Sequence, residues 1–332
     1  MKVYGKPGKV LVDIVLVASQ FGFVCAYIYF IASQIGGDNG SVYQCATSTE
    51  ENCADGNSIP QWYFLPICVL LFTPLVYVRK IEVFAATHLF GDIMIAVMLI
   101  ALTIYASIAL GKDGPKFDDV KVFNSQLFPD AIGFAVYTFE GIGVILPIME
   151  VTENKDNYYK ILCVTISFLA VFYVVWTELM VVAWGNQLTT PLITDQLPQK
   201  SVITYILKIL FTFNLLFSYP LVIHPANLVV ESWLFSTWPK SRKRQLCKNV
   251  SRTLIVVLSC VVALAVYDKL DRFLSITGAL TCIPIAFILP AALHYKACAE
   301  TPMQRGIDLT ITIVSIVMMV FCTIMAVITF NA

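Results

Sequence analysis

Nine long stretches of predominantly apolar residues run along the chain. They cover Val10–Ile35, Trp62–Val78, Glu82–Leu110, Phe128–Met149, Tyr158–Trp184, Ser201–Trp233, Thr253–Tyr267, Phe273–His294 and Ile307–Phe330. A helix needs about 20 mostly apolar residues to cross a bilayer, and continuous apolar runs favour such helices over the alternating strands of a membrane barrel. The pattern predicts an all-α polytopic membrane protein with about nine transmembrane helices, in a single domain over residues 1–332.

The composition agrees with this assignment. Apolar residues make up 58% of the 332 residues, and only 13% are charged, against about 25% in an ordinary soluble domain. These values exclude a soluble globular enzyme. The 22 basic and 22 acidic residues cancel, and this balance argues against nucleic acid as a partner.

The positions of Lys and Arg predict an orientation. Most of them lie in segments on the same side of the predicted bundle as the N-terminus, and cytoplasmic loops carry such an excess. We therefore expect the N-terminus on the cytoplasmic or equivalent side. The densest basic cluster, Lys240–Lys248, either binds anionic lipid headgroups or acts as an orientation signal only.

Two cysteines lie in a long loop on the opposite side. This loop runs from Gly36 to Pro60, contains acidic residues and has no Lys or Arg. Cys45 and Cys53 form a disulfide there if that side is oxidising, and stay reduced if it is not.

Ionisable residues inside membrane spans are costly and are functional candidates by default. His88 and Asp92 are four residues apart, so they share one helix face and can pair. Glu178 and Lys208 either snorkel towards the interface or pair with a neighbour. His224 lies between two prolines. It either has a functional role or forms a hydrogen bond with a backbone carbonyl that a proline leaves without a partner.

Glu140 differs from these residues because glycines surround it. It lies near the middle of its span, in Tyr137-Thr-Phe-Glu-Gly-Ile-Gly143. Glycines beside a carboxylate at this depth predict a helix interruption, and interrupted helices form substrate and ion sites in secondary transporters. The alternative is a glycine packing contact beside a structural glutamate.

The chain has no recognisable enzyme motif. It contains no Gly-rich phosphate loop, no nucleophile elbow and no Cys/His spacing typical of zinc. We therefore expect no enzymatic activity, no cofactor, no catalytic residue and no bound metal.

Several segments resemble one transporter family. The segment Phe134-Ala-Val-Tyr-Thr-Phe-Glu-Gly-Ile-Gly-Val-Ile-Leu-Pro147 resembles the sixth helix of the amino acid/auxin permease family, which includes proton-coupled and vacuolar amino acid transporters. The segment from Ser19 to Ala32 resembles the third helix of that family. Ser218-Tyr-Pro-Leu and His224-Pro-Ala resemble its eighth helix, and Ala286-Phe-Ile-Leu-Pro290 resembles its tenth.

The resemblance implies a fold and a site. Family members are similar to the LeuT-type fold, in which two inverted repeats of five helices enclose a substrate site between unwound parts of helices one and six. In that alignment the nine spans correspond to helices three to eleven. The resemblance then places Phe139, Glu140, Gly141 and Gly143 at the substrate site, with Tyr27 and Tyr219 as weaker candidates.

Two functional hypotheses follow from the alignment, because it leaves family helices one and two without a counterpart. The first is a structural or accessory subunit of a larger membrane complex, a transporter relative that no longer transports. The alternative is an active amino acid/proton symporter whose first helices lie outside this sequence or come from another chain.

The expected partners and location follow from the same resemblance. Lipids or other membrane subunits would cover the position of the missing helices, and an active protein would bind an amino acid and a proton. The expected location is an organelle inner membrane, an endomembrane or the vacuole.

Overall fold

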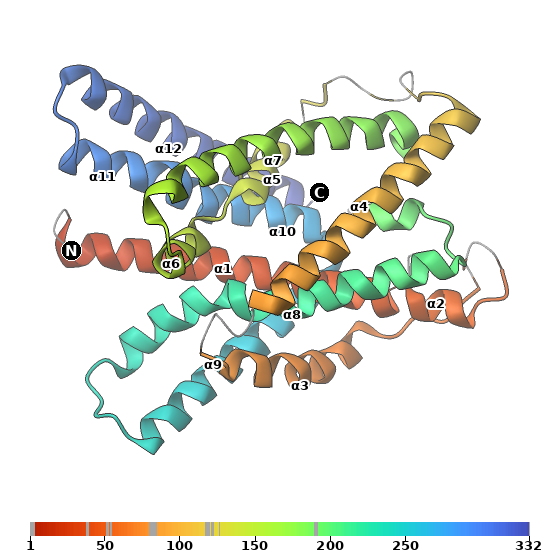
Figure 1. Cartoon of the computed structure of the whole chain (residues 1–332), viewed down its shortest axis with the longest axis horizontal. Coiled ribbons are helices and arrows are strands. Elements are labelled where there is room, and N and C mark those ends of the chain that lie inside the picture. Colours follow the sequence, from red (N-terminus) through yellow and green to blue (C-terminus); the bar gives the residue numbers. More distant parts are fainter. Residues whose placement is uncertain are drawn as a thin grey trace.

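The computed structural model describes residues 4–37, 40–50, 53, 55–79, 85–116, 120, 123–125, 127–188 and 192–331. These residues form helices joined by short turns (Figure 1). The helices are α1 Gly5–Gly36, α2 Val42–Thr47, α3 Phe64–Tyr77, α4 Ala85–Asp113, α5 Phe128–Phe139, α6 Ile142–Val151, α7 Lys155–Trp184, α8 Val202–Phe235, α9 Arg242–Ala265, α10 Leu270–Thr277, α11 Leu289–Ala297 and α12 Pro302–Asn331. Six shorter helical segments are labelled η: η1 Gln61–Tyr63, η3 Gly185–Gln187, η4 Ile193–Gln196, η5 Tyr267–Lys269, η6 Gly278–Cys282 and η7 Pro284–Ile288.

The helices have the length and composition of membrane spans. Among the described residues, seven helical segments are long and apolar enough to cross a bilayer. A helix satisfies its own backbone hydrogen bonds, as hydrocarbon requires. The prediction of an all-α polytopic membrane protein is therefore confirmed. The single-domain assignment and the inverted-repeat relationship stay predictions.

Each of the nine predicted stretches coincides with helical structure, but two differ from a simple span. The Trp62–Val78 stretch contains α3, which has only 14 residues. The Phe128–Met149 stretch is divided between α5, with 12 residues, and α6, with 10. Neither half alone reaches the length of a membrane span, so the two together form one interrupted crossing.

The apolar Thr253–Tyr267 stretch is short because its flanks are polar, and the helix that contains most of it begins earlier. Helix α9 begins at Arg242, eleven residues earlier than the apolar run. The Ser241 hydroxyl accepts a hydrogen bond from the Arg244 N–H at 3.2 Å and so caps this helix. Hydropathy cannot detect a helical turn made of cations, whereas a capping serine stabilises such a turn whether or not it is apolar.

Helix α1 passes through the centre of the bundle (Figure 1). It packs against α8 and α9, and α3 packs on α9 from the outside. The core between these four helices contains Val24, Phe72, Tyr219 and Cys260, all almost fully buried. Small residues such as Ala226 and Ala263 lie among them and let the helices approach closely, as is common in membrane bundles.

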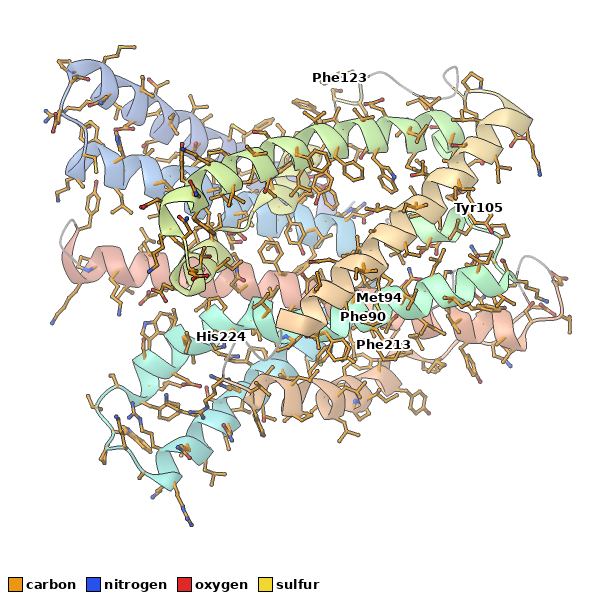
Figure 2. All side chains as sticks on the ribbon, viewed as in Figure 1. Phe90, Met94, Tyr105, Phe123, Phe213 and His224 are labelled. Carbon is orange, nitrogen blue, oxygen red and sulfur yellow. A yellow bond between two sulfur atoms is a disulfide. The ribbon has the colours of Figure 1, made fainter. Side chains whose placement is uncertain are left out.

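A second group of helices covers α8 on another side. Helix α4 crosses α8 and also packs against α7. Phe90 and Met94 of α4 lie close to Phe213 of α8 at this crossing (Figure 2). On α7 the indole N–H of Trp176 donates to the Thr103 hydroxyl of α4 at 3.1 Å, so a polar contact supplements the apolar packing.

The interrupted crossing rests on the C-terminal helices. Helix α5 packs against α10, η6 and α12. A Cβ atom on Gly278 would collide with the carbonyl oxygen of Gly133, so only glycine lets these two backbones meet this closely. On the same helix, Asp130 accepts a hydrogen bond from the Thr329 hydroxyl of α12 at 3.0 Å. These contacts hold α5 in a defined position beside α1.

Candidate functional site

The chain leaves the helical path between α5 and α6. Glu140 has φ −74° and ψ 128°, and Gly141 has φ −150° and ψ 7°, so neither residue is helical. The Tyr158 hydroxyl of α7 donates to the Ile145 carbonyl of α6 at 2.9 Å and helps to hold the second half in place. The interruption predicted at Glu140 and Gly141 is therefore confirmed.

The carboxylate of Glu140 has two different environments. Its Oε1 accepts a hydrogen bond from the backbone N–H of Ile142, the first residue of α6, at 2.9 Å. A negative charge is favourable at this position because the partial positive charge of a helix N-terminus lies there. Its Oε2 is buried and has no hydrogen-bond partner among the described residues. A buried acceptor without a partner is costly, so this oxygen is available to a proton or a cationic ligand.

A cavity of about 390 Å³ opens beside this carboxylate. Aromatic and polar groups dominate its lining, which consists of Gln20, Phe23, Tyr27, Phe30, Tyr137, Thr138, Glu140, Gly141 and Val222. The structure thus brings together the predicted residues Tyr27, Glu140 and Gly141. Tyr137 packs on Phe23 with ring centroids 4.5 Å apart, and this contact joins the lining from α1 to the lining from α5.

Phe139 lies on a different side of the break. It lines a smaller cavity of about 270 Å³ together with Glu140, Val136 and Phe287. Its ring centroid lies 5.6 Å from that of Tyr173 on α7. Phe139 therefore separates the Glu140 region from α7 and does not enter the larger cavity.

Gly143 and Gln20 meet across the interface between α6 and α1. A Cβ atom on Gly143 would lie 2.9 Å from Cδ of Gln20, closer than ordinary van der Waals contact. Gln20 is almost fully buried and lines the larger cavity. It was not among the predicted site residues, because the search for polar residues inside the spans considered only ionisable side chains and the family resemblance was used to assign other positions. A polar side chain within the apolar Val10–Ile35 run was the signal that could have identified it.

Tyr219 lies away from this site. Its ring stacks on Phe72 with centroids 4.0 Å apart, and its hydroxyl bonds the Ser259 hydroxyl at 2.8 Å. The structure places it in the core between α1, α3, α8 and α9, and it lines neither Glu140 cavity. Its sequence motif identifies the helix correctly but carries no information about which neighbour the side chain faces.

The remaining intramembrane polar residues have different surroundings. Asp92 and Glu178 are exposed on the surface of the bundle. The side chain of His88 lies outside the described residues, so its predicted pairing with Asp92 stays a prediction. His224 is buried on α8 (Figure 2).

Lys208 is almost fully buried and has several partners. Its ammonium group lies 3.6 Å from the carboxylate of Asp195, and it donates to the Gly40 carbonyl at 2.6 Å and to Oε1 of Gln199 at 3.0 Å. Of the two alternatives proposed for Lys208, pairing with a neighbour is therefore the one observed. These bonds join α8 to the loop before α2.

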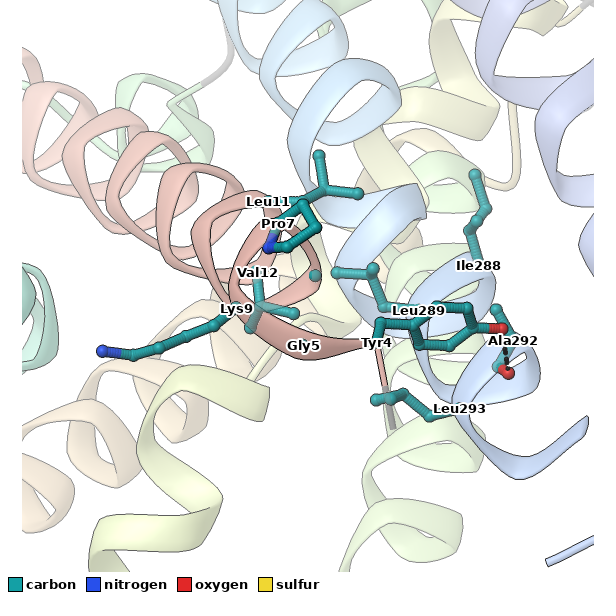
Figure 3. Close-up of a pocket in the computed structure, with 11 residues that line it drawn as sticks. Tyr4, Gly5, Pro7, Lys9, Leu11, Val12, Ile288, Leu289, Ala292 and Leu293 are labelled. Carbon is teal, nitrogen blue, oxygen red and sulfur yellow. Dashed lines mark hydrogen bonds between the residues drawn. The ribbon is translucent and has the colours of Figure 1, made fainter. Parts of the chain in front are cut away.

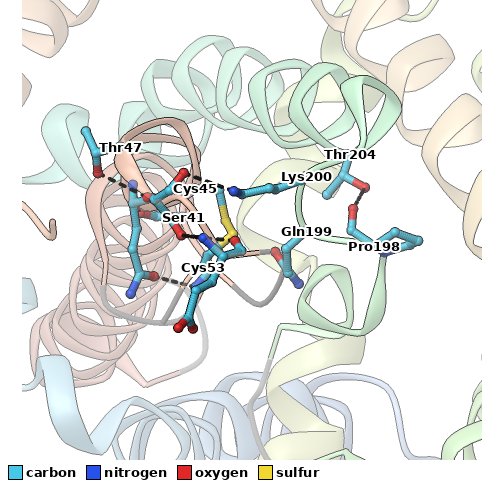
Figure 4. The surroundings of a disulfide bond; sticks show 12 residues. Ser41, Cys45, Thr47, Cys53, Pro198, Gln199, Lys200 and Thr204 are labelled. Carbon is cyan, nitrogen blue, oxygen red and sulfur yellow. Dashed lines mark hydrogen bonds between the residues drawn. A yellow bond between two sulfur atoms is a disulfide. The ribbon is translucent and has the colours of Figure 1, made fainter. Parts of the chain in front are cut away.

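A disulfide joins Cys45 of α2 to Cys53 in the segment that follows this helix (Figure 4). Lys200 donates to the Ser48 carbonyl at 2.9 Å. The hydroxyls of Ser48 and Thr49 and the N–H groups of Thr49 and Glu50 all donate to the carboxylate of Asp55. The side-chain hydrogen bond from Ser48 is the main reason why the pKa of Asp55 lies well below its usual value. The disulfide loop is thus a compact cap fixed to the start of α8.

A larger cavity of about 600 Å³ lies between the beginning of α1 and α11 (Figure 3). Its lining is mainly apolar and includes Leu11, Val12, Ile288 and Leu293. The Tyr4 hydroxyl donates to the Ala292 carbonyl at 2.9 Å at one edge. This cavity offers a surface for acyl chains or apolar side chains and lacks the buried carboxylate of the α5–α6 break.

Comparisons with known proteins place the chain among transporters. Residues 1–330 match the family model described as transmembrane amino acid transporter protein. Vacuolar amino acid transporter 3 of Schizosaccharomyces pombe is 32% identical over 97% of this chain and 47% of its own length. Vacuolar amino acid transporter 3 of Saccharomyces cerevisiae is 28% identical over 96% of this chain and 45% of its own length. Amino acid transporter AVT3C of Arabidopsis thaliana is 27% identical over 96% of this chain and 71% of its own length.

The comparisons bear directly on the two functional hypotheses. The chain spans about half the length of the two yeast relatives. Each of these relatives is named as a transporter, and none supports an accessory or non-transporting role. The family model covers nearly the whole sequence, including the interrupted α5–α6 crossing and α1 beside it. The chain therefore belongs to the transmembrane amino acid transporter family.

Proposed function

We propose that this protein transports amino acids across a membrane, with the carboxylate of Glu140 as the group that binds the substrate ammonium group or the coupling proton. The observation that carries the proposal is the buried Oε2 of Glu140, which has no hydrogen-bond partner among the described residues. An amino acid is a small zwitterion, and its ammonium group is a suitable donor for such an oxygen.

The surroundings of Glu140 support this choice of ligand. The cavity of about 390 Å³ is of the size range of small-molecule sites. Gln20 and Thr138 supply polar groups, while Phe23 and Phe30 supply apolar surface for a side chain. This mixture suits a ligand with charged and apolar parts.

The same geometry suits coupling to a proton. Oε1 accepts from the Ile142 N–H, and one proton or one ammonium group on Oε2 would give each carboxylate oxygen a partner. A proton and a substrate ammonium group then act as alternatives or in succession at one oxygen. Glutamine at this position would keep the shape but lose both the charge and the capacity to change protonation state.

We further propose a vacuolar or other endomembrane location, with the N-terminal side of α1 facing the cytoplasm. The support comes from the names of the two yeast relatives and from the bias of Lys and Arg towards that side. Fluorescence microscopy of the tagged protein and protease protection of an N-terminal tag test the two parts separately.

Transport itself is tested with the purified protein in proteoliposomes. We expect uptake of a radiolabelled amino acid mixture that increases when an inward proton gradient is imposed. Glu140→Gln should abolish gradient-driven uptake, and Glu140→Asp should retain part of it. Glu150→Gln is the matched control, because Glu150 is exposed near the end of α6 and lines neither Glu140 cavity.

Two results would overturn the proposal. One is the absence of amino acid uptake by folded wild-type protein under every imposed gradient. The other is uptake by Glu140→Gln at the wild-type rate, which would remove Glu140 from the mechanism.

A further inference from the structure

A polar cavity of about 340 Å³ lies at the turn between α8 and α9. This turn lies at one end of the bundle (Figure 1). Its lining consists of Arg79, Lys240, Ser241, Arg242, Arg244, Gln245 and Lys248. All seven side chains are polar and five carry a positive charge. This cavity shares no lining residue with the cavities around Glu140.

The described residues leave most of this positive charge without a carboxylate partner. Lys248 pairs with Glu231 at 2.6 Å. Arg79 donates to the neutral side-chain oxygen of Asn249 at 3.0 Å. Among the described residues, Arg79, Lys240, Arg242 and Arg244 form no ion pair. Like charges repel one another. An anion between these cations would relieve that repulsion, so the cavity attracts anions.

The beginning of α9 strengthens this attraction. Its first turn contains Arg242, Lys243 and Arg244 and no acidic residue. Cations are unfavourable at a helix N-terminus, because the partial positive charge of the helix dipole is already there. An anion bound in the cavity would offset both the side-chain charges and the dipole.

One side-chain atom of a lining residue lacks a hydrogen-bond partner in the part of the chain that the structure describes. The Nε of Arg244 is buried and has no hydrogen-bond acceptor among the described residues. A guanidinium N–H that is shielded from water and unpaired is costly. An oxygen of a bound anion would supply the acceptor, and a guanidinium group is well shaped to bind phosphate oxygens through two parallel hydrogen bonds.

The position of the cavity favours a lipid over a soluble anion. Trp233 lies in the last turn of α8 and Trp238 in the connection to α9, and both are exposed, as is usual for tryptophan at the membrane–water interface. Leu246 and Val250, in the next turns of α9, are mostly exposed and so present an apolar surface to lipid. The cationic cavity therefore lies at the depth of lipid headgroups.

We propose that this cavity binds a membrane lipid through a phosphomonoester on its headgroup, as in a phosphorylated inositol lipid. A phosphomonoester carries a charge of about −1.5 to −2 at neutral pH and has three strong acceptor oxygens. It therefore matches several unpaired cations better than a phosphodiester or a carboxylate does. Clusters of four or more Lys and Arg residues next to a span are typical of such recognition.

The experiment measures binding of a short-chain phosphatidylinositol phosphate to the whole protein in phosphatidylcholine nanodiscs. We expect Arg242→Gln with Arg244→Gln to weaken binding at least tenfold. Arg244→Lys should weaken it less, since it keeps the charge but loses the paired donors. Lys243→Gln is the matched control, because Lys243 lies in the same turn and has the same charge but does not line the cavity. Thermal unfolding of each variant establishes that it is folded.

The remaining arms distinguish the source and the kind of anion. Phosphatidylserine should bind at least tenfold more weakly than the phosphorylated lipid, and neither inorganic phosphate nor the soluble headgroup should match the lipid. Equal loss of binding in Lys243→Gln and in the double variant would overturn the proposal, because it would indicate diffuse charge rather than a site. Equal affinity for phosphatidylserine, or for the soluble headgroup, would also overturn it.

Discussion

Nε of Arg252 on α9 donates a hydrogen bond to Oε1 of Glu231 on α8 at 2.7 Å, and both side chains are almost fully buried. The other oxygen of Glu231 accepts from Lys248 at 2.6 Å. Arg252 also donates to the Val76 carbonyl at the end of α3. One carboxylate and one guanidinium thus join three helices inside the bundle.

Removing one partner of this pair should destabilise the protein strongly. We expect Arg252→Met to lower the free energy of unfolding by about 3–5 kcal/mol, because it leaves the carboxylate of Glu231 buried with a single cation. Denaturant unfolding in detergent micelles measures the change. The double variant Arg252→Met with Glu231→Leu should recover part of the loss, because the buried carboxylate is removed together with Arg252 and only the partly exposed Lys248 loses its partner. If the loss of stability in the double variant equalled the sum of the losses in the two single variants, the two side chains would not be coupled.

The contact between Gly143 and Gln20 leads to a second prediction. We expect Gly143→Ala to lower stability by about 1–3 kcal/mol, because the added methyl group overpacks a buried interface. Gly141→Ala is the matched control, as a Cβ atom on Gly141 meets nothing within 4 Å. Thermal unfolding of the two variants gives the comparison.

Shortening the glutamine tests the cause of that loss. Gln20→Ala combined with Gly143→Ala should be more stable than Gly143→Ala alone, because it makes room for the methyl group. If the double variant is no more stable than the single one, the close approach of these two residues is not the reason for the glycine.

The disulfide between Cys45 and Cys53 closes a short loop, with a separation of eight residues along the chain. A crosslink of this length should stabilise the loop by about 2–3 kcal/mol through the entropy of the unfolded chain. We expect reductant to lower the unfolding temperature of the wild type. The variant Cys45→Ser with Cys53→Ser should already be lowered and should not respond to reductant. A response of that variant would mean that the reductant acts elsewhere.

Asp55 should make the same loop sensitive to acid. Its pKa is lowered in the folded protein, first by the hydrogen bond from Ser48 and then by those from Thr49 and Glu50. A lowered pKa means that the carboxylate stabilises the fold above its unfolded pKa of about 3.9, and that this contribution is lost as the pH falls further towards the folded pKa. Hydrogen exchange of the Thr49 and Glu50 amides, corrected for the intrinsic rate at each pH, should give protection factors that hold from pH 6 to about pH 4 and then fall. In Asp55→Asn the exchange should be faster at pH 6 and should lack this acid-dependent step.

The apolar pattern alone was sufficient to predict the helices. A bilayer admits only segments that satisfy their own backbone hydrogen bonds, so a run of about 20 apolar residues has few alternatives. The break at Glu140 and Gly141 was also predictable. It depends on the local backbone preference of glycine and on the carboxylate charge of Glu140, which a continuous packed helix would bury. The start of α9 was not predictable from hydropathy, because a helical turn of cationic residues has the same low hydropathy as a loop.

Only the tertiary structure determined which polar groups meet. Gln20 and Gly143 are far apart in the sequence and become neighbours because α1 and α6 pack together. Lys208 and Gly40 are also far apart in the sequence, yet the Lys208 ammonium group donates to the Gly40 carbonyl. Tyr27 and Tyr219 belong to equally suggestive motifs, yet one lines the Glu140 cavity and the other stacks on Phe72 in the core. The sequence was enough to predict which segments are apolar helices and where one of them is interrupted. The partners of each side chain depend on the rotation and crossing angle of packed helices, which arise from contacts along the whole bundle and not from any local segment.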